Sequence, residues 1–334
     1  MKIVSTAPVR LDFNGGGTDV NPFAATFGGT VVNATINRGY RAVLTPRRDT
    51  LVEVIDKERR VFDLKIPLTY GEDVHFDLIR AILNYFRDKI VTGFTLIIHS
   101  DIEDSAGLGS SACFTVTVLG AMCQFLPRSV SKDEVARLAF ELETKELGWV
   151  GGKQDQWCAA YGGLNLMEFG PGERVSVRSL KLGKMAYKKF QNWLIVFYTG
   201  GKRKSSDLQI QLQKNMEAEG RIEAFQKMKQ LACETALSLE QGDIEAVGNL
   251  IDLGWQEKKH SNPLISNERI DGLYSAARRQ GALGGQLAGA GQVGYLFFLC
   301  PPQKQTAVCV VLERLGARKV DFILSKRGLK VSRQ

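Results

Sequence analysis

Short runs of apolar and β-branched residues near the start of the chain predict strands. Residues 30–36 and 41–45 are two such runs, bounded by glycine or proline, and 95–99 (TLIIH) is a third. A glycine-rich stretch follows the third run and leads into a segment, Phe114 to Phe125, whose apolar residues recur at helical spacing. The pattern therefore predicts a strand, a loop and a helix in that order.

A second helix is predicted from Lys132 to about Lys145. Ser131 stands directly before it and Glu134 follows three residues later, which is the pattern of a capping box. In such a box each of the two side chains binds the backbone N–H of the other residue, so the start of the helix is well defined.

After a polar stretch at 170–189, the second half of the chain mixes strands with longer helices. Apolar residues recur with a helical period in 222–231 and again in 244–251, and a further helix is predicted at 306–315. The strands predicted in this half are 193–198, 294–299 and 319–325.

The length of 334 residues and the two blocks of mixed elements predict an α+β fold with two domains, 1–185 and 186–334. The composition, 44% hydrophobic and 24% charged, is that of a globular protein and excludes a disordered chain or a disulfide scaffold. The six cysteines form no C-x-x-C pair and the three histidines lie far apart, which excludes zinc-finger spacing. A reduced, cytoplasmic setting is expected.

The chain carries 44 Lys and Arg residues against 36 Asp and Glu, and the net charge of +8 favours anionic partners. No basic stripe is interleaved with aromatic residues, so nucleic acid is not an expected partner. Two uncharged windows, 105–127 and 281–302, are long enough to span a bilayer, but their serines, threonines and glycines favour a buried helix or strand beside a glycine loop. No membrane association is therefore expected.

The segment from Asp104 to Cys113, DSAGLGSSAC, is the clearest candidate for chemistry. Its glycines allow consecutive N–H groups to point the same way, and the positive end of the following helix adds to them. Ser110 and Ser111 are expected at the first positions of that helix. The residues expected to bind a polyphosphate are Gly107, Leu108, Gly109, Ser110, Ser111 and Ala112. The segment matches neither a Walker loop nor the strict Rossmann motif, and an ordinary glycine turn capped by serine is the alternative.

Three ordered segments resemble the signatures of the GHMP kinase superfamily. The first runs from Ala7-Pro8-Val9-Arg10-Leu11 to Asp19, the second is the glycine loop, and the third is GGQLAGAG at 284–291. The resemblance covers nearly the whole chain. It implies a two-domain GHMP kinase-like fold, with an N-terminal mixed α/β domain that carries the phosphate loop and a C-terminal ferredoxin-like α+β domain. It also implies a kinase that uses ATP with Mg²⁺.

Four longer strings are similar to the heptose 7-phosphate kinase branch of this superfamily, namely residues 15–19, 33–37, 151–156 and 254–271. The resemblance implies a cytoplasmic enzyme that phosphorylates the anomeric hydroxyl of D-glycero-D-manno-heptose 7-phosphate to the 1,7-bisphosphate, for lipopolysaccharide or capsule synthesis. Its partners would be the sugar phosphate and MgATP, and a homodimer is allowed. The alternatives are a kinase of an unphosphorylated fucose- or galactose-type sugar and a catalytically silent sugar or nucleotide sensor.

The resemblance also assigns catalytic and metal-binding roles. Asp155 matches the catalytic aspartate, which would accept the proton of the sugar hydroxyl, and Arg10 matches the cation beside it. Glu143 matches a metal-binding glutamate that would hold Mg²⁺ together with Ser111, with Glu141 as a near competitor. On local sequence alone, Asp155 would be a turn residue and Glu143 a solvated helix residue.

For the substrate, Asp19 matches an acceptor of sugar hydroxyls, because each carboxylate oxygen can accept two hydrogen bonds. The other residues that the resemblance indicates are Gly16, Gly17, Thr18, Lys153, Gly289, Lys258 and Lys259. Lys258 and Lys259 are favoured over the cluster 202–204 for a substrate phosphate. Gly16 and Gly17 replace two larger residues that are frequent in the superfamily, which either makes room for a bulkier substrate or tightens the turn.

Overall fold

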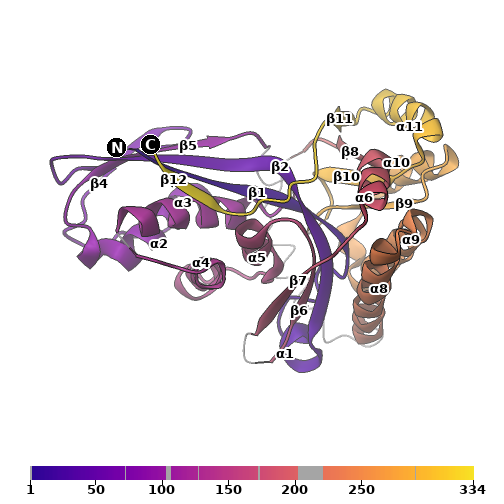
Figure 1. The fold of residues 1–334 in the computed structure, drawn as a ribbon, viewed down its shortest axis with the longest axis horizontal. Helices are drawn as coiled ribbons and strands as arrows, with labels where there is room; N and C mark the ends of the chain where they lie inside the picture. The colour runs from indigo at the N-terminus through magenta and orange to yellow at the C-terminus, as the bar shows by residue number, and fades with distance from the viewer. Residues whose placement is uncertain are drawn as a thin grey trace.

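The computed structural model describes residues 2–71, 73–102, 107–126, 128–171, 174–201, 221–289 and 291–334, and its strands form two sheets (Figure 1). The larger sheet has eight strands in these residues, in the order β12-β1-β2-β5-β3-β4, with β6 paired to β2 and β7 to β6. Its strands are β1 (Ile3–Asn14), β2 (Gly29–Pro46), β3 (Val52–Ile55), β4 (Arg59–Phe62), β5 (Phe94–Ser100), β6 (Leu164–Phe169), β7 (Val175–Ser179) and β12 (Lys330–Arg333).

The strands predicted at 30–36 and 41–45 are parts of the single strand β2, so the predicted break between them is wrong. Its first part pairs with β6, ending at Ala34 opposite Leu164, and its second part pairs with β5, beginning at Tyr40 opposite Ser100. The polar residues 37–39 lie where β2 changes partner. They interrupt the apolar pattern without ending the strand, because β1 pairs with β2 on both sides of them.

Helices cover one face of the larger sheet (Figure 1). They are α2 (Val74–Phe86), α3 (Ser110–Phe125), α4 (Lys132–Glu141) and α5 (Gln154–Tyr161), with the short turns η1 (Arg87–Lys89) and η2 (Leu142–Glu146). The short helix α1 (Phe23–Phe27) lies apart from them, near β6 and β7 (Figure 1). The predicted order of strand, loop and helix is confirmed by β5 and α3. The capping box of Ser131 and Glu134 is confirmed as well, and the helix that it starts ends in η2, a π-helical turn.

The smaller sheet is antiparallel, in the order β11-β8-β10-β9. Its strands are β8 (Leu194–Tyr198), β9 (Gly284–Leu287), β10 (Tyr295–Leu299) and β11 (Arg318–Val320), and its helices are α6 (Lys184–Trp193), α8 (Arg221–Gln241), α9 (Ile244–Ser261), η3 (Pro263–Ile265), α10 (Glu268–Arg279) and α11 (Pro302–Arg314). The predicted α+β fold of two parts is confirmed. The division at 185 and 186 stays a prediction.

The strand predicted at 319–325 is shorter than expected. β11 ends at Val320, and Leu324 forms only an isolated bridge with Ile36 of the larger sheet. The chain leaves the smaller sheet here and returns to the larger one, where β12 pairs with β1. The apolar pattern of this segment therefore reflects packing between the two sheets.

Aromatic packing fixes the end of β1 against the smaller sheet. The ring of Phe13 is fully buried and meets Phe190 of α6 and Phe297 of β10 edge-on, with ring centroids 5.1 and 5.5 Å apart. The side chain of Gln286 in β9 also donates a hydrogen bond to the backbone oxygen of Asp12. The strand residues just before Phe13 are thereby held at the junction of the two sheets.

No helix in the described ranges combines the length and the apolar character needed to cross a bilayer.

We expect Phe13→Ala to lower the free energy of unfolding by about 3–5 kcal/mol, because it removes a fully buried ring and leaves a cavity between the sheets. Urea unfolding followed by circular dichroism measures the loss. Val91→Ala, at a side chain that is 81% exposed, is the control and should change stability little. A loss below about 1 kcal/mol for Phe13→Ala would contradict the packing described.

Candidate functional site

A single arginine of β1 connects two distant segments of the chain. The Arg10 side chain is 5% exposed, and its Nε and Nη2 donate to Oδ1 and Oδ2 of Asp155 at 2.7 and 3.0 Å. Its Nη1 donates to the backbone oxygen of Gly107 at 2.7 Å. The guanidinium therefore holds the glycine loop before α3 beside the first turn of α5.

The charge of Arg10 is maintained by its neighbours. Burial by itself would lower its pKa, but the carboxylates of Asp155 and Asp12 more than offset this and hold the pKa of Arg10 above its ordinary value. The Asp155 side chain is 24% exposed, so it keeps one side open while both oxygens are held by Arg10. A carboxylate in this position can accept a proton from a bound hydroxyl group.

The glycine loop presents the start of α3 to the same place. α3 begins at Ser110, as predicted, and no side chain caps it. Within the described residues, the first amide of this helix with a backbone acceptor is that of Cys113, which bonds to Gly109 at 3.0 Å. No described residue accepts the N–H groups of Ser111 and Ala112, which can therefore donate to an anion, and the helix dipole favours one there.

Gly109 is the contact between the loop and the carboxylate. Its φ of 74° is a left-handed conformation that favours glycine, and a Cβ placed on it would lie 2.8 Å from the Asp155 carboxyl carbon. A side chain at this position would push the carboxylate away. The loop and Asp155 are therefore in direct contact, as the sequence interpretation requires.

Asp19 lies near this carboxylate, beside the first residue of α5. Its Oδ1 accepts from the backbone N–H of Gly17 at 3.1 Å, and its Oδ2 accepts from that of Gln154, the first residue of α5, at 3.0 Å. Burial raises the pKa of Asp19 and the charge of Asp155 adds to the increase, while the two backbone donors lower it. Each oxygen keeps a second lone pair for a ligand hydroxyl.

A buried ion pair completes the polar groups. Lys258, in the last turn of α9, donates to Oδ2 of Asp12 at 3.0 Å, and the two side chains are only 6% and 1% exposed. Gly16 packs directly on this pair, because a Cβ there would overlap the Asp12 carboxylate and lie 3.5 Å from the Lys258 ammonium. Close packing of Gly16 supports the tighter-turn alternative for this loop.

These groups line one cavity between the two sheets. Its lining residues are Arg10, Asp12, Gly16, Gly17, Asp19, Val20, Gly152, Gln154, Asp155, Phe225, Lys258, Ser261, Asn262, Ile265 and Gly289. Seven of the residues indicated by the sequence are among them. Gly289 of the third segment lies against the backbone of Gly107, so this segment also reaches the glycine loop.

Three of the predicted substrate residues do not line the cavity. Lys259 pairs with Asp271 at 3.4 Å, and its ammonium lies 5.9 Å from the ring centre of Trp255. The Lys153 side chain is buried, with its ammonium 5.6 Å from the Phe140 ring. The hydroxyl of Thr18 donates to the backbone of its own loop. The cluster 202–204 and residues 104–106 and 290 lie outside the described residues.

The sequence interpretation missed Asp12, Gln154 and the end of α9 at 261–262. Asp12 is two residues after Arg10, and strand alternation could have placed both on one face. Asn262 comes four residues after Lys258, which is one helical turn. Neither signal identifies the partner of Lys258, because Asp12 is 246 residues away in the chain.

Glu143 lies beside the start of α3 and is the candidate metal ligand. Its Oε1 is 3.0 Å from the hydroxyl of Thr115, which also lies 2.9 Å from the backbone oxygen of Ser111, and its Oε2 accepts from Gln156 at 3.1 Å. Burial raises the pKa of Glu143 to about 8, and the charge of Asp155 contributes to the increase. A buried carboxylate of this kind is stabilised by a cation, and hydroxyl and carboxylate oxygens are ligands that suit Mg²⁺.

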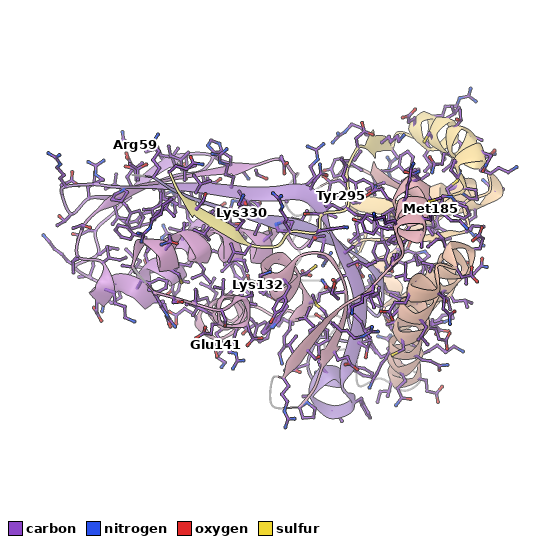
Figure 2. The ribbon with its side chains drawn as sticks, viewed as in Figure 1. Arg59, Lys132, Glu141, Met185, Tyr295 and Lys330 are labelled. Atoms are coloured by element: carbon purple, nitrogen blue, oxygen red, sulfur yellow. The ribbon has the colours of Figure 1, made fainter. Side chains whose placement is uncertain are left out.

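The competitor Glu141 has a different environment. It pairs with Lys145 at 3.1 Å, with 38% of its side chain exposed, and lies at the outer edge of the helices (Figure 2). Within the described residues, no group of three or more His, Cys, Asp or Glu side chains could hold a metal. Glu143 and Ser111 fit a metal ion that takes its remaining oxygen ligands from bound phosphates and water.

Two family models match most of the chain. The model of the GHMP kinases N terminal domain matches residues 77–163, and that of the GHMP kinases C terminal matches residues 220–317. The chain is 30% identical to a D-glycero-alpha-D-manno-heptose 7-phosphate kinase from Campylobacter jejuni, covering 99% of each chain.

Two solved structures illustrate the likeness in fold. A D-glycero-D-manno-heptose 1-phosphate kinase from Bacteroides thetaiotaomicron superposes with a TM-score of 0.82 at 28% identity, over 99% of each chain. A galactokinase from Lactococcus lactis, complexed with galactose, superposes with a TM-score of 0.79 over 98% of this chain and 95% of the other. At 18% identity, the second comparison shows only a shared fold.

The environment of Glu143 predicts a pH-dependent stability difference. Its pKa is about 8 in the folded protein and ordinary in the unfolded chain, so between these values the folded state binds more protons. This group therefore lowers the free energy of unfolding by up to about 1.4 kcal/mol for each unit that the pH rises. Glu143→Gln removes the effect, and its stability relative to wild type should increase from pH 5 to pH 8 in urea unfolding.

Glu141→Gln is the matched control for this measurement. Its carboxylate is partly exposed and paired at the surface, so its stability relative to wild type should stay nearly constant over the same pH range. If the free energies of unfolding of wild type and Glu143→Gln change with pH in the same way, the Glu143 carboxylate is not in the buried environment described.

Proposed function

Because the chain belongs to the GHMP kinase family and is a small-molecule kinase, we propose that it transfers the terminal phosphate of ATP to the anomeric hydroxyl of a heptose 7-phosphate. The observation that carries this proposal is the Arg10 guanidinium, which binds the glycine loop and the Asp155 carboxylate at once. A phosphate on the loop and a hydroxyl at the carboxylate would therefore be adjacent. Adjacency and orientation are the main protein contribution to phosphoryl transfer.

The phosphates of ATP would bind at the start of α3. The N–H groups from Gly109 onward and the Ser110 and Ser111 hydroxyls can donate to phosphate oxygens, and the helix dipole favours the negative charge. Gly289 packs on the other side of Gly107 and would limit the space around the phosphates. Arg10 contacts this loop through the Gly107 oxygen, so its positive charge would stabilise the negative charge that develops on the phosphate during transfer.

Asp155 would act on the acceptor hydroxyl. The sugar oxygen would attack the terminal phosphorus while its proton passes to a carboxylate oxygen of Asp155, and the bond between that phosphorus and the ADP oxygen would break. Asp19, which lines the same cavity, would accept hydrogen bonds from neighbouring sugar hydroxyls. These bonds would orient the ring so that one hydroxyl faces the phosphate.

Glu143 and Ser111 would hold Mg²⁺ beside the phosphates. When bound, this ion would neutralise part of the charge on the transferred group. The pKa of Glu143, raised by burial to about 8, supports this role, because a nearby cation would favour its ionised form.

A kinase of an unphosphorylated sugar is the second candidate, and one observation favours it. Both cations among the described residues that line the cavity already have carboxylate partners, Arg10 with Asp155 and Lys258 with Asp12. The identity to the Campylobacter jejuni heptose 7-phosphate kinase supports the phosphorylated substrate instead. Lys258 would meet a substrate phosphate with the two ammonium protons that Asp12 does not accept.

We expect Asp155→Asn to lower kcat by about 10²-fold or more, because the amide cannot accept the proton and leaves Arg10 without its paired charge. Steady-state assays with a sugar phosphate and MgATP measure kcat and KM, and a thermal melt checks folding. Asp243→Asn, at the N-cap of α9, is the control, since asparagine also caps helices. A kcat within about twofold of wild type for Asp155→Asn would remove this residue from the mechanism.

A comparison of substrates tests which sugar is the phosphate acceptor. The values of kcat/KM are compared for D-glycero-D-manno-heptose 7-phosphate, the corresponding 1-phosphate, the free heptose, galactose and fucose. The kcat/KM for the 7-phosphate should be about tenfold or more above that for every other sugar, because its phosphate forms a charge-assisted hydrogen bond with Lys258. Equal or faster turnover of a free hexose would favour the second candidate, and turnover of the 1-phosphate alone would overturn the anomeric assignment.

A further inference from the structure

The helices α2, α3 and α4 leave the other face of the larger sheet uncovered (Figure 1). A second cavity is lined by residues of the strands β1, β2 and β5. It is an open depression of about 490 Å³, bordered by β1, β2, β5 and the chain segment from Ser325 to Lys330. It shares no lining residue with the cavity that contains Asp155. Its volume falls in the range of about 300–1,000 Å³ that is typical of small-molecule sites.

Strand register brings basic side chains into one row across this face. Lys330 of β12 is opposite Thr6 of β1, Thr6 is opposite Arg41 of β2, and Arg41 is opposite His99 of β5. Adjacent strands are about 4.8 Å apart, and directly opposite residues point to the same side of a sheet. The Lys330, Arg41 and His99 side chains are all exposed, and Figure 2 labels Lys330 on β12.

This row is not neutralised by carboxylates in the described part of the chain. No ion pair there includes Arg41, Lys330 or Arg327, which lies three residues before Lys330 and also lines the cavity. Asp101 is the one acidic residue among the described lining residues, and it is already engaged by Arg38 at 3.8 Å and by the backbone N–H of Gly39 at 2.6 Å. Lys330 and Arg41 stand on either side of Thr6, so the two positive charges lie two strands apart on the same face, and a bound anion would reduce the repulsion between them.

We propose that this cavity binds a phosphorylated small molecule at a site separate from the catalytic one. The Arg41 and Arg327 guanidinium groups match phosphate oxygens in pairs, and the Lys330 ammonium and the Thr6 hydroxyl add donors between them. The next residues along the same face, Pro8 and Gly39, are opposite each other and have little or no side chain. They leave a flat surface for the uncharged part of the ligand.

This site does not depend on the proposed function. The basic row is short and confined to one cavity, which fits one or two phosphate groups better than an extended polyanion. Among the described residues, no hydrogen bond or ion pair joins Arg41, Arg327 or Lys330 to Arg10, Asp155 or residues 107–112, so substitutions in the row should leave basal kinase activity unchanged.

The test is a calorimetric titration of the full chain with inorganic pyrophosphate at low ionic strength. Wild type is compared with Arg41→Gln/Arg327→Gln and with Lys188→Gln/Lys227→Gln, a control that removes the same charge from exposed positions on α6 and α8. The glycine loop is intact in all three proteins, so any difference between them reports the second site.

We expect Arg41→Gln/Arg327→Gln to lose one pyrophosphate site per chain, or to bind there at least about tenfold more weakly, with unchanged kcat and melting temperature. The control should titrate like wild type. If the two double variants give superimposable titrations, the proposal is overturned. It is overturned equally if the Arg41→Gln/Arg327→Gln titration matches wild type and only its oligomeric state changes.

Discussion

The whole site depends on where one buried guanidinium is placed. The backbone of Arg10 is fixed by pairing with Thr35 of β2 and by its N–H, which donates to the Leu108 oxygen at 3.2 Å. Its three donating side-chain nitrogen atoms reach two other segments. Its guanidinium binds the backbone of the glycine loop and the first turn of α5 at the same time. Bidentate pairing also fixes the angle of the Asp155 carboxylate as well as its distance, which a lysine could not do.

The positive charge of a buried arginine needs negative charges nearby, and here it belongs to a row of side chains that alternate in sign. Asp155, Arg10, Asp12 and Lys258 alternate in sign from α5 through β1 to α9, and Lys258 brings the smaller sheet's helices into the network. Loss of one member leaves its partner uncompensated in a dry environment, which typically costs about 3–5 kcal/mol. The network thus couples the alignment of the two sheets to the geometry of the cavity.

The sequence predicts the local parts of this arrangement well. The start of α3 at Ser110, the capping box at Ser131 and the cavity position of Asp19 follow from short-range patterns or from the resemblance. These features depend on neighbours within a few residues, where spacing and hydrogen-bond chemistry are readable. The roles of the residues in catalysis stay predictions.

The sequence does not predict which residues far apart in the chain contact one another. Lys258 and Lys259 are adjacent and equally basic, yet only Lys258 faces the cavity, because the helix turns by about 100° between them. The polar residues 37–39 suggested a break in a strand that in fact continues while changing partners. In both cases the outcome is decided by a distant segment, Asp12 in one and β5 and β6 in the other.

A crystal structure of the full chain with a nonhydrolysable ATP analogue and Mg²⁺ tests the role of Arg10 most directly. The terminal phosphate should lie on the amides that follow Gly109, with Arg10 still bidentate to Asp155 and a carboxylate oxygen within about 3–6 Å of the phosphate oxygens. The arrangement described would be contradicted if the nucleotide bound elsewhere. It would also be contradicted if Arg10 no longer bound Asp155 while the glycine loop remained ordered.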